Sequence, residues 1–137
     1  MIDECLAVEF EVRDDDCPLA DATREVDVRI DAKPPQLRHD GYVLLQFNAA
    51  PSDRLQAILD DDDRVRYLHR ADGDDHDTYR CLSKHPCVVH DLVSSGFVVE
   101  SLQYQHGRAV FFGAVVGRDV LKGVMAGVAV MTLFWSL

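Results

Sequence analysis

Alternation of apolar and polar residues along the chain predicts a protein rich in β-strands. Leu6 to Val12 and Val26 to Ile30 both alternate with a period of two, which is typical of strands that bury one face. Further strands are predicted over residues 42–47, 64–70, 78–82, 97–104 and 108–116. The last two flank His106-Gly107, which predicts a hairpin.

Three helices are predicted among these strands. Pro51-Ser52-Asp53 opens a short helix that stops at the aspartates of residues 60–63. Pro86 to Ser95 forms a second helix, closed by Gly96, and a last helix begins near Arg118.

Two further segments lack a clear period. RDDDCPLADAT, residues 13–23, is predicted to be a loop because Pro18 interrupts it. Residues 123–137 carry no charge, but this run is too short for a membrane-spanning helix, which needs about 17–25 residues. We therefore expect a terminal strand or helix that is buried in the core or against a second subunit, and hence a homo-oligomer without membrane insertion.

The order of elements predicts the fold class. From Tyr42 to Tyr104 the order is strand, helix, strand, strand, helix, strand, which is typical of the ferredoxin-like split βαβ arrangement. Two extra N-terminal strands and a C-terminal strand and helix would extend it. A chain of 137 residues fits one domain, so the sequence predicts a single α+β domain over residues 1–137.

Composition limits the surroundings and the partners of the chain. Its net charge is −10, from 24 acidic and 14 basic residues, and 19 of the acidic residues are Asp. We interpret this surface as adapted to high salt, which predicts a halophilic source. Duplex binding needs clustered Lys and Arg, so direct nucleic-acid binding by this chain is not expected. The N-terminus resembles no signal peptide, and four irregularly spaced cysteines predict reduced thiols in a cytoplasmic protein.

RCLSKHPCVVHDL, residues 80–92, holds the densest group of candidate chemical residues: Cys81, His85, Cys87 and His90. These four side chains have the chemistry of a zinc site, although their spacing matches no common zinc motif. Cys87 in the first turn of a helix is alternatively a redox-sensitive or nucleophilic thiol, tuned by a histidine. An ordinary strand-to-helix junction is the third alternative.

Four arginines form a second candidate site, for an anion. Arg64, Arg66, Arg70 and Arg80 can share one face of the hairpin made by the strands at 64–70 and 78–82. Their guanidinium groups suit a phosphate or an anionic metabolite, or they pair with the abundant Asp residues. Motifs of hydrolases, P-loop proteins and dinucleotide-binding proteins are missing, so an enzyme is not expected.

Several stretches resemble a known family. DDCPLADATREVDV, PPQLRHDGYVLLQF, YRCLSKHPCVVHDLVSSGFVVESLQY and GRAVFFGAVVGRDVLKGVM are similar to the N-terminal region of haloarchaeal helix-turn-helix regulators of the bacterio-opsin-activator type. The resemblance covers about residues 1–125, and it implies an α+β regulatory or ligand-sensing region. In that family a DNA-binding helix-turn-helix follows, and this sequence offers no counterpart to its DNA-reading residues.

Two functions follow from these observations. The first is a stand-alone or truncated regulatory domain of an archaeal transcription regulator. It would act by self-association, by contact with a full-length regulator, or by binding a small effector. The second is a redox- or metal-responsive sensor that uses the Cys81–His90 cluster.

Overall fold

The structure is a computed structural model that describes residues 5–13, 16–84, 93, 96–117, 119, 122 and 132–136, the last five by their backbone alone.

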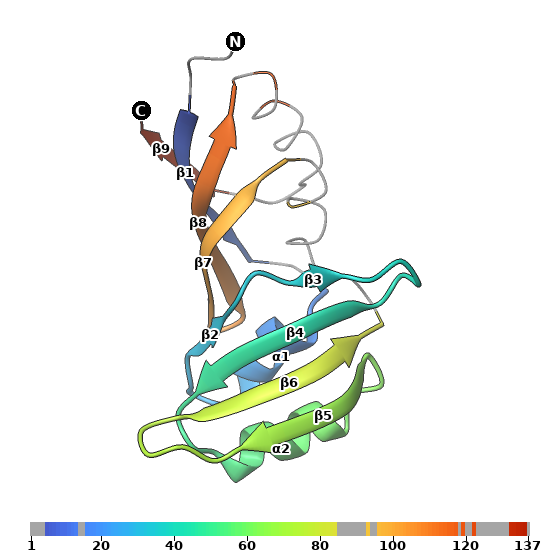
Figure 1. The fold of residues 1–137 in the computed structure, drawn as a ribbon. Coiled ribbons are helices and arrows are strands. Elements are labelled where there is room, and N and C mark those ends of the chain that lie inside the picture. Colours follow the sequence, from blue (N-terminus) through green and yellow to red (C-terminus); the bar gives the residue numbers. More distant parts are fainter. Residues whose placement is uncertain are drawn as a thin grey trace.

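One antiparallel sheet with two short helices makes up the described part of the chain (Figure 1). Its elements are β1 (Cys5–Val12), α1 (Pro18–Glu25), β2 (Ile30–Ala32), β3 (Gln36–Leu37), β4 (Val43–Ala49), α2 (Asp53–Asp60), β5 (Val65–Ala71), β6 (Asp77–Ser83), β7 (Val98–Gln105), β8 (Arg108–Val116) and β9 (Thr132–Ser136). The strand order is β5-β6-β4-β2-β7-β8-β1-β9, and β3 pairs with β4 beside this path.

The predicted ferredoxin-like α+β fold is wrong. The strand β2 lies between β4 and β7, because Ile30 pairs with Ala49 on one side and with Tyr104 on the other. The sheet then continues through β8, β1 and β9, so the N-terminal strand lies next to the edge strand β9 of one large sheet. The predicted helices at 86–95 and after Arg118 lie outside the described residues, apart from single positions in them.

Most strand positions are confirmed, and one predicted loop is a helix. The first strand of the chain, those at 42–47, 64–70 and 78–82, and the hairpin around His106-Gly107 lie where the alternation placed them. The strand predicted from Val26 to Ile30 is wrong for most of its length, because β2 begins only at Ile30. Residues 18–25, however, form α1, with Pro18 at its first positions, where a missing N–H costs nothing. Proline therefore starts this helix and does not break it. The terminal run contains the strand β9.

The helices cover one face of the sheet and leave the other open. Figure 1 shows α1 and α2 on the same side of β4, β6 and β5. Leu19 from α1 and Leu55 and Leu59 from α2 are fully buried there. On the sheet, the rings of Phe47 and Tyr79 stack beneath them at 5.1 Å. The open face of β4, β6 and β5 has no described helix against it, so its side chains are available for other contacts.

None of the helices in the described ranges is long and apolar enough to cross a membrane.

Candidate ligand-binding site on the open sheet face

A β-bulge in β5 decides which of the four arginines share a face. Arg66 pairs with Leu82 and His69 with Arg80, so three steps along β5 match two along β6. Before the bulge Arg66 lies on the open face, and after it Arg70 lies opposite the buried Tyr79 on the helix face. Strict alternation, on which the sequence prediction relied, would have kept Arg66 and Arg70 together.

Arg64 is engaged by three carboxylates on the helix side. Its guanidinium nitrogens lie 2.6 Å from Asp16, 2.8 Å from Asp21 and 2.7 Å from Asp62. The hydrogen bond to Asp62, then that to Asp21, holds the pKa of Arg64 above its ordinary value, against the effect of burial. This residue joins α1 to the turn that precedes β5, and its donors are used within the fold.

Arg70 is engaged in the same way. It donates to Asp77 at 2.8 Å, to Asp53 at 2.9 Å and to Gln56 at 2.7 Å. Hydrogen bonds to Asp53 and Asp77 raise the pKa of Arg70 above its usual range. Because Asp53 and Gln56 belong to α2, Arg70 fastens this helix to the sheet.

Arg80 and Arg66 differ from the other two arginines. Both are exposed on the open face, and neither has an ion pair with a residue that the structure describes. Arg80 lines a pocket of about 370 Å³ on this face, within the size range of ligand sites. The residues around the pocket are Lys33, Pro34, Gln36, Arg38, Leu44, Leu45, Gln46, Tyr67, Arg80, Cys81 and Leu82.

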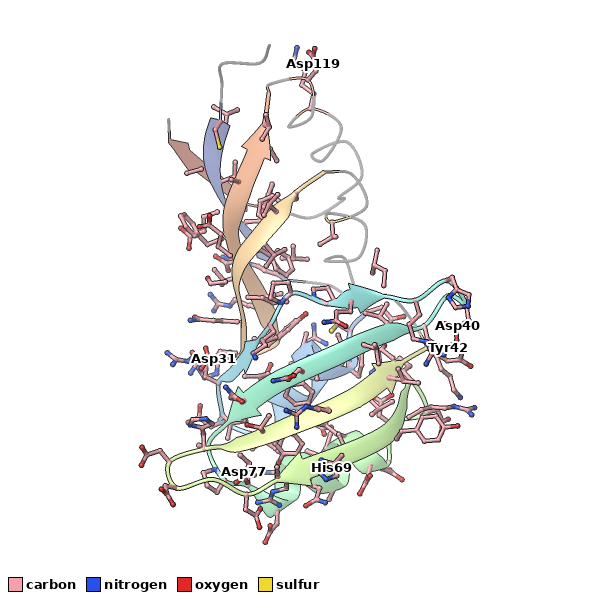
Figure 2. All side chains as sticks on the ribbon, viewed as in Figure 1. Asp31, Asp40, Tyr42, His69, Asp77 and Asp119 are labelled. Atoms are coloured by element: carbon pink, nitrogen blue, oxygen red, sulfur yellow. The ribbon has the colours of Figure 1, made fainter. Side chains whose placement is uncertain are left out.

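Cross-strand pairing arranges these side chains in two rows. One row is apolar at its centre, where Leu44 on β4 lies opposite Leu82 on β6. In the next row Gln46 lies opposite Arg80, and Arg80 lies opposite His69 on β5 (Figure 2, where His69 is labelled). Residues i and i+2 of a strand point to the same face and lie about 7 Å apart. The apolar row and the cationic row therefore lie side by side on the open face.

Tyr67 adds an exposed aromatic ring to the edge of the pocket. It forms part of the bulge, has a φ of 56°, and its residue is 79% exposed. A bulky residue in the left-handed region costs on the order of 1–3 kcal/mol, and such strain clusters at functional sites. The bulge therefore places Tyr67 beside the pocket at the expense of local stability.

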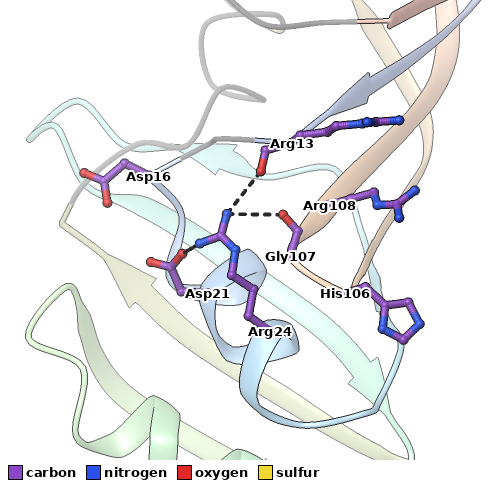
Figure 3. A pocket seen from close by; sticks show the side chains of 7 residues that line it. All are labelled: Arg13, Asp16, Asp21, Arg24, His106, Gly107 and Arg108. Atoms are coloured by element: carbon purple, nitrogen blue, oxygen red, sulfur yellow. Dashed lines mark hydrogen bonds and ion pairs between the residues drawn. The ribbon is translucent and has the colours of Figure 1, made fainter.

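A second pocket, at the β7–β8 turn, gives a contrasting example (Figure 3). It measures about 460 Å³ and is lined by Arg13, Asp16, Asp21, Arg24, His106, Gly107 and Arg108. Its cations already have acidic partners: Arg13 and Arg108 contact Glu11 at 3.1 and 3.4 Å, and Arg24 contacts Asp21. An anion bound here would compete with these carboxylates.

Arg24 in that pocket has a structural role. It donates to the backbone carbonyls of Arg13 at 3.1 Å and Gly107 at 3.4 Å, as Figure 3 shows. The N–H of Gly107 in turn donates to Thr23 Oγ1 at 2.9 Å. Gly107 has a φ of +76°, and an added Cβ would overlap the Arg24 side chain, so the backbone conformation and the contact both favour glycine. We conclude that this pocket is a junction between α1 and the hairpin.

The cysteine and histidine cluster lies mostly outside the described residues. His85, Cys87 and His90 fall there, and Cys81 is buried in β6. Burial raises the pKa of the Cys81 thiol to about 12, which disfavours the thiolate that binds metals. Within the described ranges no three His, Cys, Asp or Glu residues gather as a metal site would require. Cys17 is disulfide-bonded, so the prediction that every cysteine is reduced is wrong for this residue.

The two free thiols that the structure describes should differ in reactivity. Cys5 is exposed and Cys81 is buried with a raised pKa, so brief treatment with iodoacetamide at pH 8 should modify Cys5 first. Peptide mass spectrometry before and after unfolding in urea measures both sites. Modification of Cys81 in the folded protein at the rate of Cys5 would contradict its burial.

Of the residues that line the open-face pocket, two were predicted from the sequence as candidate site residues, Arg80 and Cys81, and the others were missed. Lys33 and Arg38 come from the segment between β2 and β4, which carried no periodic pattern. Tyr67 reaches the pocket through the bulge, and no residue in that strand marks a bulge in advance. The exposed leucine on β4, Leu44, breaks the strict alternation of that strand and was the one available signal.

Comparison with known proteins identifies one family. A family model described as "BAT: GAF and HTH_10 associated domain" matches residues 3–128. No curated protein and no solved structure matches the chain.

Proposed function

Because the chain belongs to the BAT family of GAF and HTH_10 associated domains, we propose that it is a regulatory domain that senses a small effector in the open-face pocket. The family match confirms the resemblance to bacterio-opsin-activator-type regulators and associates the domain with transcription regulation. Effector sensing is our proposal beyond the family match, and binding of the effector would supply the regulator with a signal.

The pocket on β4 and β6 supports this proposal. Its floor holds Leu44 and Leu82, of which Leu44 is 39% exposed, and its cationic side holds Arg80, which has no ion pair among the described residues. An apolar floor with a few convergent polar groups is the usual composition of a small-molecule site. Strain at Tyr67 beside the pocket is a second sign of function.

Nuclear magnetic resonance with a fragment library tests the proposal. The library should contain neutral, anionic and cationic fragments in equal numbers, added to ¹⁵N-labelled protein at one KCl concentration. We expect the fragments that bind to shift amide signals of β4, β6 and the Tyr67 bulge, because these line the pocket. Shifts that spread over other faces, or no shifts from any fragment, would refute a sensing role for the pocket.

Two exposed leucines provide a matched pair of variants. Leu44→Glu puts a carboxylate into the pocket floor, and it should weaken fragment binding at least about tenfold, since a charge is costly to desolvate. Leu37→Glu makes the same change on β3, at a residue that is 41% exposed and outside the pocket lining. This control should bind fragments as the wild type does.

A further inference from the structure

We propose that the effector is a small organic monoanion, with an apolar body about the size of one aromatic ring and a carboxylate at one end. The inference rests on the proposed function, because it assigns a chemical class to the ligand of the same pocket. Three features of the site carry it: the balance of charges around the pocket, the spacing of its two rows, and the position of Tyr67.

The charge balance around the pocket is opposite to that of the chain. The chain has 24 acidic and 14 basic residues, but the pocket lining contains Lys33, Arg38 and Arg80 and no Asp or Glu. The guanidinium of Arg38 forms an ion pair with Asp40 at 2.7 Å. Arg80 and Lys33 make no ion pair with the described residues, so their charges are available to a ligand.

An anion should bind more tightly in the open-face pocket than in the pocket at the β7–β8 turn. The cations of that turn are paired with Glu11 and Asp21, whose carboxylates a ligand would have to displace. At Arg80 the ligand's carboxylate would displace no carboxylate of the described residues, and the guanidinium fork can bind it through two parallel hydrogen bonds. The open face is therefore the stronger anion site of the two.

The two rows set the size and the character of the ligand. The apolar row, with Leu44 and Leu82, lies about 7 Å from the row that contains Gln46 and Arg80. A molecule that uses both rows needs an apolar part about 7 Å from its charge, which inorganic phosphate lacks. Tyr67 at the rim offers a ring face, so an aromatic body suits the pocket.

A matched set of probes tests the charge and the apolar part separately. The probes are 3-phenylpropionate, the neutral 3-phenyl-1-propanol, 3-phenylpropylamine and inorganic phosphate, each titrated into ¹⁵N-labelled protein at constant ionic strength. We expect 3-phenylpropionate to bind at the pocket about tenfold more tightly than the alcohol, since a hydrogen bond between two charged groups is stronger than one to a neutral hydroxyl. The amine and phosphate should bind more weakly still.

Two arginine variants locate the charge effect. Arg80→Gln should lower the affinity for 3-phenylpropionate about tenfold and leave that for the alcohol unchanged. Arg54→Gln removes an exposed arginine from α2, on the opposite side of the sheet, and should change neither affinity.

The outcomes distinguish this inference from the proposed function. If the alcohol or the amine binds in the pocket as tightly as the carboxylate, or if Arg80→Gln has no effect, the inference that the effector is an anion is refuted. The proposal that the pocket senses an effector is unaffected by that result. If phosphate competes equally with 3-phenylpropionate, the apolar part is refuted. If no probe and no library fragment shifts the amides of β4 and β6, the proposed function fails together with the inference.

Discussion

Replacing Gly113 by alanine is expected to destabilise the protein by about 3 kcal/mol. Gly113 lies in the middle of β8, between Val99 on β7 and Val8 on β1. A Cβ at this position would lie 2.0 Å from the carbonyl oxygen of Val98 and 2.9 Å from the Phe97 ring. Overpacking that shifts side chains and backbone typically costs about 1–3 kcal/mol, and we expect the upper end of this range because the added Cβ overlaps a backbone oxygen. Chemical denaturation monitored by circular dichroism measures the change.

Gly41 provides the control for this substitution. It has a φ of +87°, and an added Cβ would meet nothing within 4 Å. Gly41→Ala therefore isolates the conformational cost, which is about 1 kcal/mol. If Gly113→Ala is no more destabilising than Gly41→Ala, the close approach of β7 to β8 is wrong.

The second large effect is expected at Asp77. Its carboxylate is 2% exposed, lies 2.7 Å from Arg70 Nη2, and accepts the N–H of Gly73 at 3.3 Å. Asp77→Asn keeps the shape but removes the charge, so the Arg70 fork faces a neutral amide at the base of α2. Breaking a buried pair from one side costs about 3–5 kcal/mol, and we expect the lower part of this range because Asp53 remains.

Asp75 serves as the matched control for Asp77. It lies two residues earlier, in the loop that precedes β6, is exposed, and makes no ion pair with the residues that the structure describes. Asp75→Asn should change the free energy of unfolding by less than about 0.5 kcal/mol. Equal effects of the two substitutions in urea denaturation would show that Asp77 is not part of a buried pair.

Local pattern predicted the strands well, because one face of each strand is buried. In β1, Leu6, Val8 and Phe10 are fully buried and alternate with more exposed residues, which is the signal that the sequence carries. The helix α1 was missed because its polar residues and Pro18 resemble a loop. Its Thr23 and Ala22 are buried through contacts with distant segments, which local pattern does not encode.

The topology and the site depended on pairing between distant strands. The short β2 holds one buried residue of high β-propensity, Ile30, yet it separates β4 from β7 and thereby overturns the ferredoxin-like order. The bulge in β5 likewise divided the four arginines between two faces. Neither feature leaves a periodic signal, so the sequence placed Arg80 correctly on a strand but not its neighbours across the sheet.

The pairing of β1 with the distant strand β8 has a consequence for the kinetics of folding. Leu6 pairs with Val115, whereas the hairpins β5–β6 and β7–β8 join neighbouring segments of the chain. The hairpins can form early, but β1 has to close a loop that spans most of the protein, which is entropically costly and slow. During synthesis at about 5–20 residues per second, Leu6 waits on the order of ten seconds for its partner strand. For that time the apolar face of β1 is exposed, which makes it the segment most prone to non-native pairing in the nascent chain.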